Sequence, residues 1–285
     1  MPSGPAEPVP DPPDGDPNRL WWDERAALHG QDAIYDRAGF LAGASTLTRL
    51  DAEITGDVNG LDLLHLQCHT GMDTLSWLRA GAAQVTGVDF SAVAVAAART
   101  LAEESGLAGR ARFVAADVLA VPAELRGRFD LCYASRGVVG WIADIEAWMR
   151  TAATMLRPGG RLVLIEMHPL FVMVDSLDPL RLGFPYANDG PRHFSASGSY
   201  AAPDAATQHN DTVEYGHSVG EVVTAAATAG LHVEHLGEHL EVETDVGRGL
   251  LPRDADGLLR WRVTGELLPV LYSLRARRPA AAAQS

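Results

Sequence analysis

Between residues 61 and 167 the sequence alternates short apolar runs with stretches of helical periodicity, and this alternation restricts the fold more than any other feature. Apolar runs typical of buried strands occupy residues 61–66, 85–90, 112–117, 129–135 and 161–167. Helices are expected over 73–79, 92–104 and 144–156, the second beginning after the N-cap residue Ser91. Strands separated by helices in this way pair in parallel, through right-handed crossovers.

A long segment over 169–216 then interrupts the alternation, and it is rich in Pro, Gly, Asp and aromatic residues. A connection of this length inside a compact domain usually carries function, so we expect a lid or binding insert. Ser218 and Glu221 form a capping-box pattern for the next helix, and strand-like runs follow over 231–236 and 268–276. The sum is an α/β fold with a doubly wound, mostly parallel sheet of about seven strands and helices on both faces.

The composition excludes several classes of function. All 23 basic residues are arginine, against 37 acidic residues and a net charge of −14. Without lysine there is no Schiff-base chemistry, no covalently bound pyridoxal phosphate and no Walker phosphate loop. The acidic excess argues against nucleic acid as a partner. The two cysteines, Cys68 and Cys132, have no zinc-binding spacing with histidines, so we predict no metal.

The N-terminal residues 1–18 hold seven of the 17 prolines and four acidic residues, which predicts a disordered tail. This tail lacks the basic and apolar regions of a signal peptide, and no run of apolar residues reaches the length that spans a membrane. We therefore expect a cytoplasmic protein with no membrane attachment, folded as one domain over 19–285, for which a homodimer remains open.

Polar residues follow the first four expected strands, at the edge where doubly wound sheets bind ligands. Asp89 follows the second strand, 18 residues beyond Gly71, close to the spacing at which a carboxylate accepts both ribose hydroxyls. Asp117 follows the third strand and could accept an adenine amino group. Gly71 alone remains of the G-x-G-x-x-G pattern, so no backbone cradle for a diphosphate is expected. An adenosine without a phosphate chain favours S-adenosylmethionine over NAD.

Three stretches carry a resemblance to a known family: LHLQCHTGMDTL over 64–75, VTGVDFS over 85–91 and RPGG over 157–160. They resemble one branch of the class I S-adenosylmethionine-dependent methyltransferases, and the resemblance extends from about residue 21 to 278. The usual first motif of that superfamily has an acidic residue where this chain has Gln67, and glycines where it has His69 and Asp73. The resemblance implies a Rossmann-like fold and the cofactor S-adenosylmethionine, with S-adenosylhomocysteine as product.

The same resemblance divides the domain into four parts: an N-terminal cover over 19–45, a cofactor-binding core over 60–168, a substrate lid over 169–216, and the C-terminal part of the sheet over 217–278. It implies a cofactor site drawn from the cover and from the ends of four strands. Its expected members are Trp22, Gln67, His69, Thr70, Gly71, Thr74, Asp89, Phe90, Ser91, Asp117, Val118, Ser135 and Arg136.

Candidates for catalysis lie in the cover, at the end of the fifth strand and in the insert. Glu166 is an ionisable residue at the end of an apolar strand, which makes it our first choice as general base, with His209 and Tyr35 as further catalytic candidates. Trp141 and His168 are the expected substrate contacts. These residues suit a small aromatic acceptor, and carbon 3 of an indole in secondary metabolism is the specific expectation. An N- or O-methyltransferase, a nicotinamide-dependent oxidoreductase and a non-catalytic binding protein remain alternatives.

Six further aromatic residues lie in the insert, and two interpretations of them are open. They could line a pocket for a flat substrate, or they could form a small core of the lid itself. For most of them we expect the second. The six are Phe171, Phe184, Tyr186, Phe194, Tyr200 and Tyr215.

Overall fold

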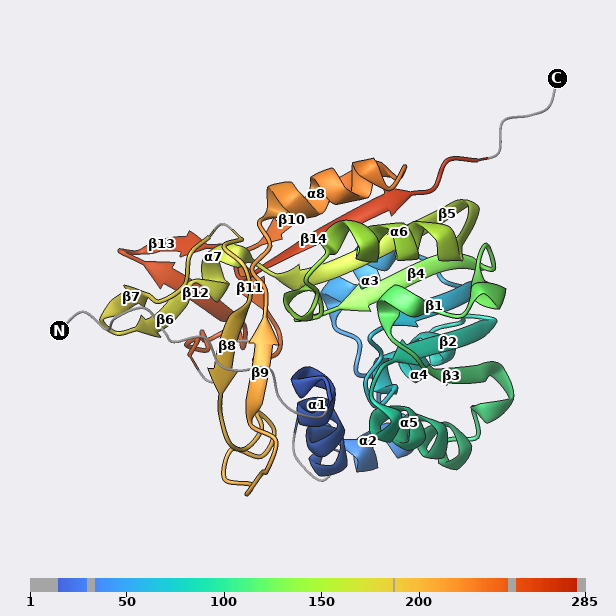
Figure 1. Ribbon diagram of the computed structural model, residues 1–285, viewed down its shortest axis with the longest axis horizontal. Helices are drawn as coiled ribbons and strands as arrows, with labels where there is room; N and C mark the ends of the chain where they lie inside the picture. The colour runs from blue at the N-terminus through green and yellow to red at the C-terminus, as the bar shows by residue number, and fades with distance from the viewer. Residues whose placement is uncertain (1–14, 30–33, 187, 246–249, 281–285) are drawn as a thin grey trace.

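A seven-stranded sheet forms the centre of the computed structural model, which describes residues 15–29, 34–186, 188–245 and 250–280 (Figure 1). The strands lie in the order β10-β14-β5-β4-β1-β2-β3. β14 is antiparallel to both of its neighbours, and the other pairs are parallel. This confirms the predicted α/β fold. The bounds are β1 Asp62–Leu66, β2 Gln84–Asp89, β3 Ala111–Ala115, β4 Phe129–Ser135, β5 Leu156–Met167, β10 His232–His239 and β14 Leu271–Arg277.

Helices cover both faces of the sheet because side chains alternate along each strand. In β1, Leu64 and Leu66 pack with residues of α6 and α8, whereas Leu63 packs on the opposite face with residues of α3 and α4. Ser91 caps α5, and Ser218 and Glu221 form the predicted capping box of α8. The helices are α1 Pro17–Leu28, α2 Arg37–Leu41, α3 Arg49–Thr55, α4 Met72–Arg79, α5 Ala92–Glu104, α6 Ile145–Met155 and α8 Val219–Thr228.

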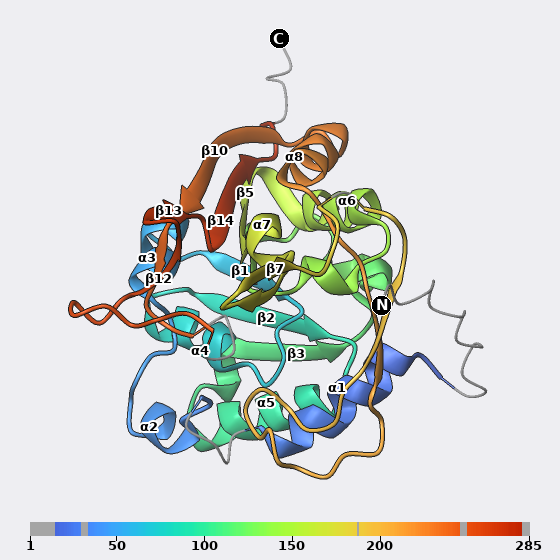
Figure 2. The same ribbon diagram turned by 90° about the vertical axis from the view of Figure 1, so that its left-hand side faces the viewer.

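The insert over 169–216 consists of a short helix and two hairpins. They are α7 Pro169–Val172, β6 Val174–Leu177 with β7 Leu180–Leu182, and β8 Arg192–Ser195 with β9 Asp211–Glu214. The hairpin β8–β9 lies beside α1, so the N-terminal helix and the insert meet in space (Figures 1 and 2). Phe184 packs edge-on against Phe194, and Phe171 packs against Trp261. Among the described residues, only Phe184 and Phe194 of the six aromatic residues therefore pack on each other within the insert, whereas a core of the insert was expected for most of them.

The structure departs from several of the predicted boundaries. Pro17 and Asn18 belong to α1 rather than to a disordered tail, since Asp16 caps the helix and the Asn18 amide exchanges two hydrogen bonds with the backbone of Val213. Residues 1–14 of the expected tail lie outside the described residues. β5 begins at Leu156, five residues early, because Arg157 is held by carboxylates of the neighbouring strands. β14 begins at Leu271 instead of 268.

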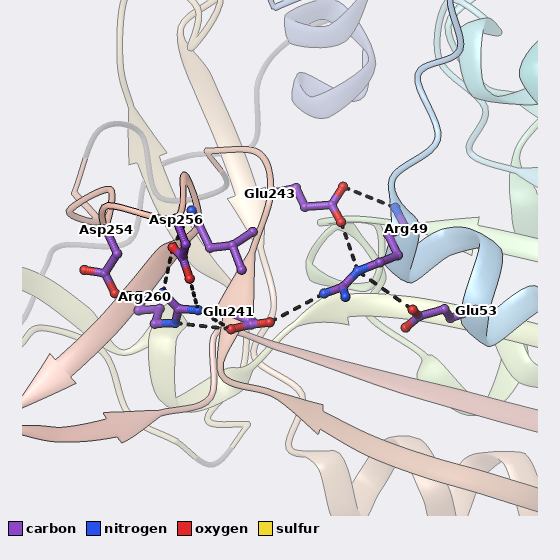
Figure 3. Close-up of polar contacts among 8 residues, drawn as sticks. Arg49, Glu53, Glu241, Glu243, Asp254, Asp256 and Arg260 are labelled. Carbon is purple, nitrogen blue, oxygen red and sulfur yellow. Dashed lines mark hydrogen bonds and ion pairs between the residues drawn. The ribbon is translucent and has the colours of Figure 1, made fainter.

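A small sheet of β11 Glu241–Val242, β12 Leu259–Val263 and β13 Glu266–Leu268 was not predicted. Charged side chains join it to α3 (Figure 3). Arg49 pairs with Glu53 of its own helix and with Glu241 and Glu243. Arg260 in turn pairs with Glu241, Asp254 and Asp256. Exposed pairs of this kind each stabilise a fold by about 0–1 kcal/mol, so the network orients the small sheet more than it stabilises it.

Candidate functional site

A cavity of about 720 Å³ opens at the carboxyl ends of β1 to β4. This is the edge of the sheet at which the sequence predicted the cofactor site. The predicted cofactor residues that line it, from both the sheet and the cover, are Trp22, Gln67, His69, Thr70, Gly71, Asp89, Phe90, Asp117, Val118, Ser135 and Arg136. Thr74 and Ser91 do not line it: both are buried, one bonded to His65 and the other capping α5.

The turn after β1 has an unusual backbone. Gln67 and His69 have φ angles of 56° and 50°, and Gly71 has 77°, so three alternating residues are left-handed. Non-glycine residues rarely adopt this conformation, and such strain is concentrated at functional sites. Trp148 donates to the Gln67 side chain, which itself donates to the carbonyl of Val138, and both bonds are 2.8 Å long. Because Gln67 and His69 have positive φ angles, these are the two positions of the turn at which a glycine would relieve backbone strain.

Asp73, where the usual first motif has a glycine, lies within the first turn of α4, and its backbone there is helical. Its side chain lines the cavity and is partly buried, with a hydrogen bond from the Thr46 hydroxyl. Burial raises the pKa of Asp73 to about 6. The sequence analysis did not assign Asp73 to the site, although an acidic residue directly after the glycine turn was a usable signal.

Asp89 lies at the end of β2, where its two carboxylate oxygens accept the backbone N–H groups of His69 (2.8 Å) and Ser91 (2.9 Å). Each oxygen keeps acceptor capacity toward the cavity. Burial raises the pKa of Asp89 to about 6, opposed by these two hydrogen bonds. Asp117 lines the cavity from the end of β3, where it is exposed and accepts the N–H of Leu119.

Two side chains on the cavity wall hold buried nitrogens without a partner among the described residues. His65 is bonded through Nδ1 to Thr74, while its Nε2 has none, and burial lowers its pKa to about 3. Arg136 donates to Asp51 at 2.9 Å, while its Nε has none. Unsatisfied buried polar groups are costly, and both nitrogens are shielded from the cavity by the atoms around them.

Aromatic and imidazole rings form the opposite wall. Tyr35 stacks on both His29 and His69, and its hydroxyl is hydrogen-bonded to that of Tyr200. Trp22 packs edge-on against His69 and against Trp141. Tyr35 and Trp141, predicted as catalytic and substrate residues, thus line the cavity.

A chain of hydrogen bonds crosses this wall. His69 contacts Thr70 through Nδ1 and His29 through Nε2 at 3.1 Å, and His29 contacts the Ser199 hydroxyl at 2.6 Å. Burial, with a smaller effect of His29, lowers the pKa of His69 to about 3, so the ring is neutral at pH 7. The chain connects the glycine turn, the cover and the insert.

Glu166 does not line the cavity, and our choice of it as general base was wrong. Its side chain is buried, and Oε1 accepts the N–H groups of Gly137 (2.5 Å) and Met167 (2.6 Å). Oε2 accepts those of Val138 (2.7 Å) and Val139 (3.0 Å). All the acceptor positions of the carboxylate are used, so Glu166 shapes the turn after β4 rather than taking a proton from a substrate.

Two histidines assigned to the site also lie elsewhere. His168 is buried, caps α7 by accepting the N–H of Leu170, and contacts Glu238 at 2.8 Å. His209 is exposed, and its backbone rather than its ring is held, by Glu24. Strand periodicity predicted that His168 lies on the same face of the sheet as Glu166. It could not predict that the His168 ring caps the helix that follows.

The insert supplies cavity residues that the sequence analysis had not selected, namely His193, Val213, Tyr200 and Tyr215. The last two were expected in the core of the lid. The many aromatic residues of the insert indicated that some of them could line a pocket. Which rings face the cavity depends on how the insert folds. In the part of the chain that the structure describes, no three His, Cys, Asp or Glu side chains group as a metal site, and no helix is long and apolar enough to cross a bilayer.

Residues 63–160 match the family model described as a methyltransferase domain. Among curated proteins, the chain is similar to a ubiquinone biosynthesis O-methyltransferase of Rhodopseudomonas palustris, with 30% identity over 152 residues, which are 52% of this chain and 57% of that protein. It is also similar to a demethylmenaquinone methyltransferase of Thermus thermophilus, with 41% identity over 91 residues, covering 32% and 40%. The chain thus matches about half the length of these relatives.

Solved structures show the same fold. An S-adenosylmethionine-dependent methyltransferase from Mesorhizobium loti has a TM-score of 0.58 and 23% identity, covering 84% of this chain and all of that one. A geranyl diphosphate C-methyltransferase from Streptomyces coelicolor has a TM-score of 0.55 and 15% identity, covering 94% and 100%. The fold is that of the class I methyltransferases. Residues 63–160 thus match a methyltransferase domain, in the part of the chain where the sequence motifs lie.

Proposed function

We propose that this protein transfers a methyl group from S-adenosylmethionine to a small aromatic molecule, with carbon 3 of an indole as the specific acceptor. The observation that carries the proposal is a single cavity whose two ends are lined by chemically different side chains. Carboxylates at the ends of β2 and β3 suit a nucleoside, and a wall of aromatic rings suits a flat acceptor. When bound, S-adenosylmethionine supplies an activated methyl group on a positively charged sulfur.

The residues on the sheet side fit this cofactor. Asp89 accepts the ribose hydroxyls, and Asp117 accepts the adenine amine. At the other end of the nucleoside site, Asp73 pairs with the ammonium group, and the Arg136 guanidinium on the cavity wall attracts the carboxylate. The turn after β1 does not suit a dinucleotide. A diphosphate must approach the backbone closely there, and the side chains of Gln67 and His69 stand in its way.

The acceptor side favours a neutral ring over a phosphorylated substrate. Arg136 is the one arginine among the described residues on the cavity wall, and it already pairs with Asp51. A diphosphate, which the Streptomyces coelicolor neighbour binds with Mg²⁺, would have no free cation here. Trp22, Tyr35 and Trp141 instead offer apolar faces.

Methyl transfer breaks the bond between carbon and sulfur while the electron pair of the acceptor forms the new bond, and the acceptor then loses a proton. Positioning of the two reactants and exclusion of water supply most of the rate, about 7–11 kcal/mol in well-oriented systems. Tyr35 is the candidate among our three catalytic residues that lines the cavity.

A screen of methyl acceptors tests this proposal directly. The protein would be incubated with methyl-labelled S-adenosylmethionine and panels of indoles, phenols and amines, and mass spectrometry would locate the added methyl group. We expect label on the carbon of an indole. Transfer to a phenol would support an O-methyltransferase, as the name of the ubiquinone relative suggests for that class. Binding of S-adenosylhomocysteine without transfer to any panel would refute the choice of acceptor, and no binding would refute the cofactor.

The affinity for S-adenosylhomocysteine should also depend on pH. Asp73 and Asp89 have pKa values of about 6 without ligand, and the ionised forms are the ones that accept the ammonium and the ribose hydroxyls. Affinity should be constant above pH 7 and fall below pH 6 by up to about tenfold per pH unit for each carboxyl that must lose its proton. Calorimetry at constant ionic strength measures this. Asp73→Asn should make the fall shallower, and an equally steep fall in that variant would remove Asp73 from the site.

A further inference from the structure

Helix α1 contacts both α5, which follows the cofactor-side strand β2, and the β8–β9 hairpin of the insert (Figure 1). Three consecutive residues make the connection. Asp23 accepts the hydroxyl of Ser91, the residue whose N–H is bonded to Asp89. The next two residues, Glu24 and Arg25, turn instead toward the insert.

Arg25 is fully buried, although its guanidinium lies in a surface insert. It donates to the backbone carbonyls of Gly198 (3.0 Å) and Ala196 (3.1 Å), and to that of His209. It also donates to the side chains of Thr207 and Asn210, both at 3.1 Å. Five acceptors from residues 196–210 therefore converge on one side chain.

The neighbouring residues complete this arrangement. The Glu24 carboxylate accepts the backbone N–H groups of Gln208 (2.8 Å) and His209 (2.9 Å), and pairs with Arg25 at 3.0 Å. The Arg25 guanidinium also lies over the ring of Trp21, 4.3 Å from its centroid. A buried cation that satisfies this many backbone groups is costly to remove, because both the charge and its acceptors lose their partners.

The loop that Arg25 holds carries part of the acceptor wall. Ser199 and Tyr200 lie within it, the first bonded to His29 and the second to Tyr35. Arg25 itself does not line the cavity. We propose that Arg25 is a positioning residue, which holds residues 196–210 against α1 so that Tyr200 closes the acceptor side of the cavity. This proposal rests on the proposed function for the meaning of that wall.

Hydrogen–deuterium exchange of the full-length protein tests the proposal, with Arg25→Met compared with the wild type. We expect exchange of residues 196–210 to be at least tenfold faster, and chymotrypsin to cut after Tyr200. The affinity for S-adenosylhomocysteine, measured by calorimetry, should remain within threefold, since Asp23 still fixes α1 beside Asp89. Arg25→Lys keeps the charge but not the planar fork of donors, and should give an intermediate rate. Arg19→Met, an exposed arginine of the same helix, is the matched control.

Asn210→Ala removes one of the acceptors of Arg25 and should raise the hydrogen–deuterium exchange of residues 196–210 by a smaller factor than Arg25→Met. This second variant keeps the proposal testable if Arg25→Met fails to fold. Unchanged exchange over 196–210 in both variants would overturn the proposal. A parallel loss of cofactor affinity in Arg25→Met would overturn it also, because the residue would then support the fold as a whole. If the wild type binds no S-adenosylhomocysteine, the proposed function fails, while the exchange result still decides whether Arg25 holds the loop.

Discussion

Replacing Asp89 by alanine is expected to weaken the binding of S-adenosylhomocysteine about 100-fold or more. A hydrogen bond to a charged group contributes about 1.5–3 kcal/mol, and a carboxylate that accepts two ribose hydroxyls makes two of them. Asp89 also holds the N–H groups of His69 and Ser91, so the variant loosens the turn that faces the cofactor. Isothermal titration calorimetry of the purified variant measures the change.

Two controls separate binding from folding in this experiment. Asp89→Asn keeps one carbonyl acceptor and should lose less affinity than alanine, and thermal melts show whether either variant remains folded. Glu124→Gln removes an exposed carboxylate that does not line the cavity and should bind as the wild type does. An Asp89→Ala variant that is folded and binds S-adenosylhomocysteine with unchanged affinity would remove the ribose role from Asp89.

The sequence predicted the core of this fold well because its signals are local. Hydrophobic alternation decides which residues of a strand are buried, and β4 begins and ends at the predicted residues, Phe129 and Ser135. Caps are read from three or four adjacent residues, which explains the success at Ser91 and at Ser218 with Glu221. The cofactor edge followed from the same logic, because parallel strands present their ends together.

The acceptor side could not be predicted in the same way, because its residues meet only in the folded chain. Tyr35 and Tyr200 are 165 residues apart, and His29 and Ser199 are 170 apart. Neither the insert nor the cover has a periodicity that says which ring faces inward. Arg25 was likewise one arginine among 23, and its burial depends on a loop that no sequence pattern places beside α1.

Glu166 shows most clearly where residue type and strand position are insufficient. An acidic residue at the end of an apolar strand needs a compensating partner, and this inference holds. The partner, however, is the turn at Gly137, Val138 and Val139, 27 to 29 residues earlier in the chain. Burial raises the pKa of Glu166 while the four N–H donors lower it, and no acceptor position remains for a substrate proton.

Glu166→Ala should therefore reduce the free energy of unfolding by about 3–5 kcal/mol, since it leaves four buried N–H donors without an acceptor and opens a cavity. Glu166→Gln should cost about 2–3 kcal/mol, because its amide NH₂ would face N–H groups that need an acceptor. Denaturant unfolding followed by circular dichroism measures both. Glu146→Gln on the exposed side of α6 should change stability by less than about 0.5 kcal/mol.

The same pair of variants decides between the two roles considered for Glu166. A residue that shapes the turn after β4 changes stability first, and it changes activity only as far as Arg136 and Val138 move at the cavity wall. A general base does the opposite: Glu166→Gln would keep the stability of the wild type and lose about 10²–10⁴-fold in methyl transfer. Wild-type stability with lost transfer would restore Glu166 as the base, in spite of its four backbone partners. We expect the stability loss, because glutamine cannot accept four N–H groups.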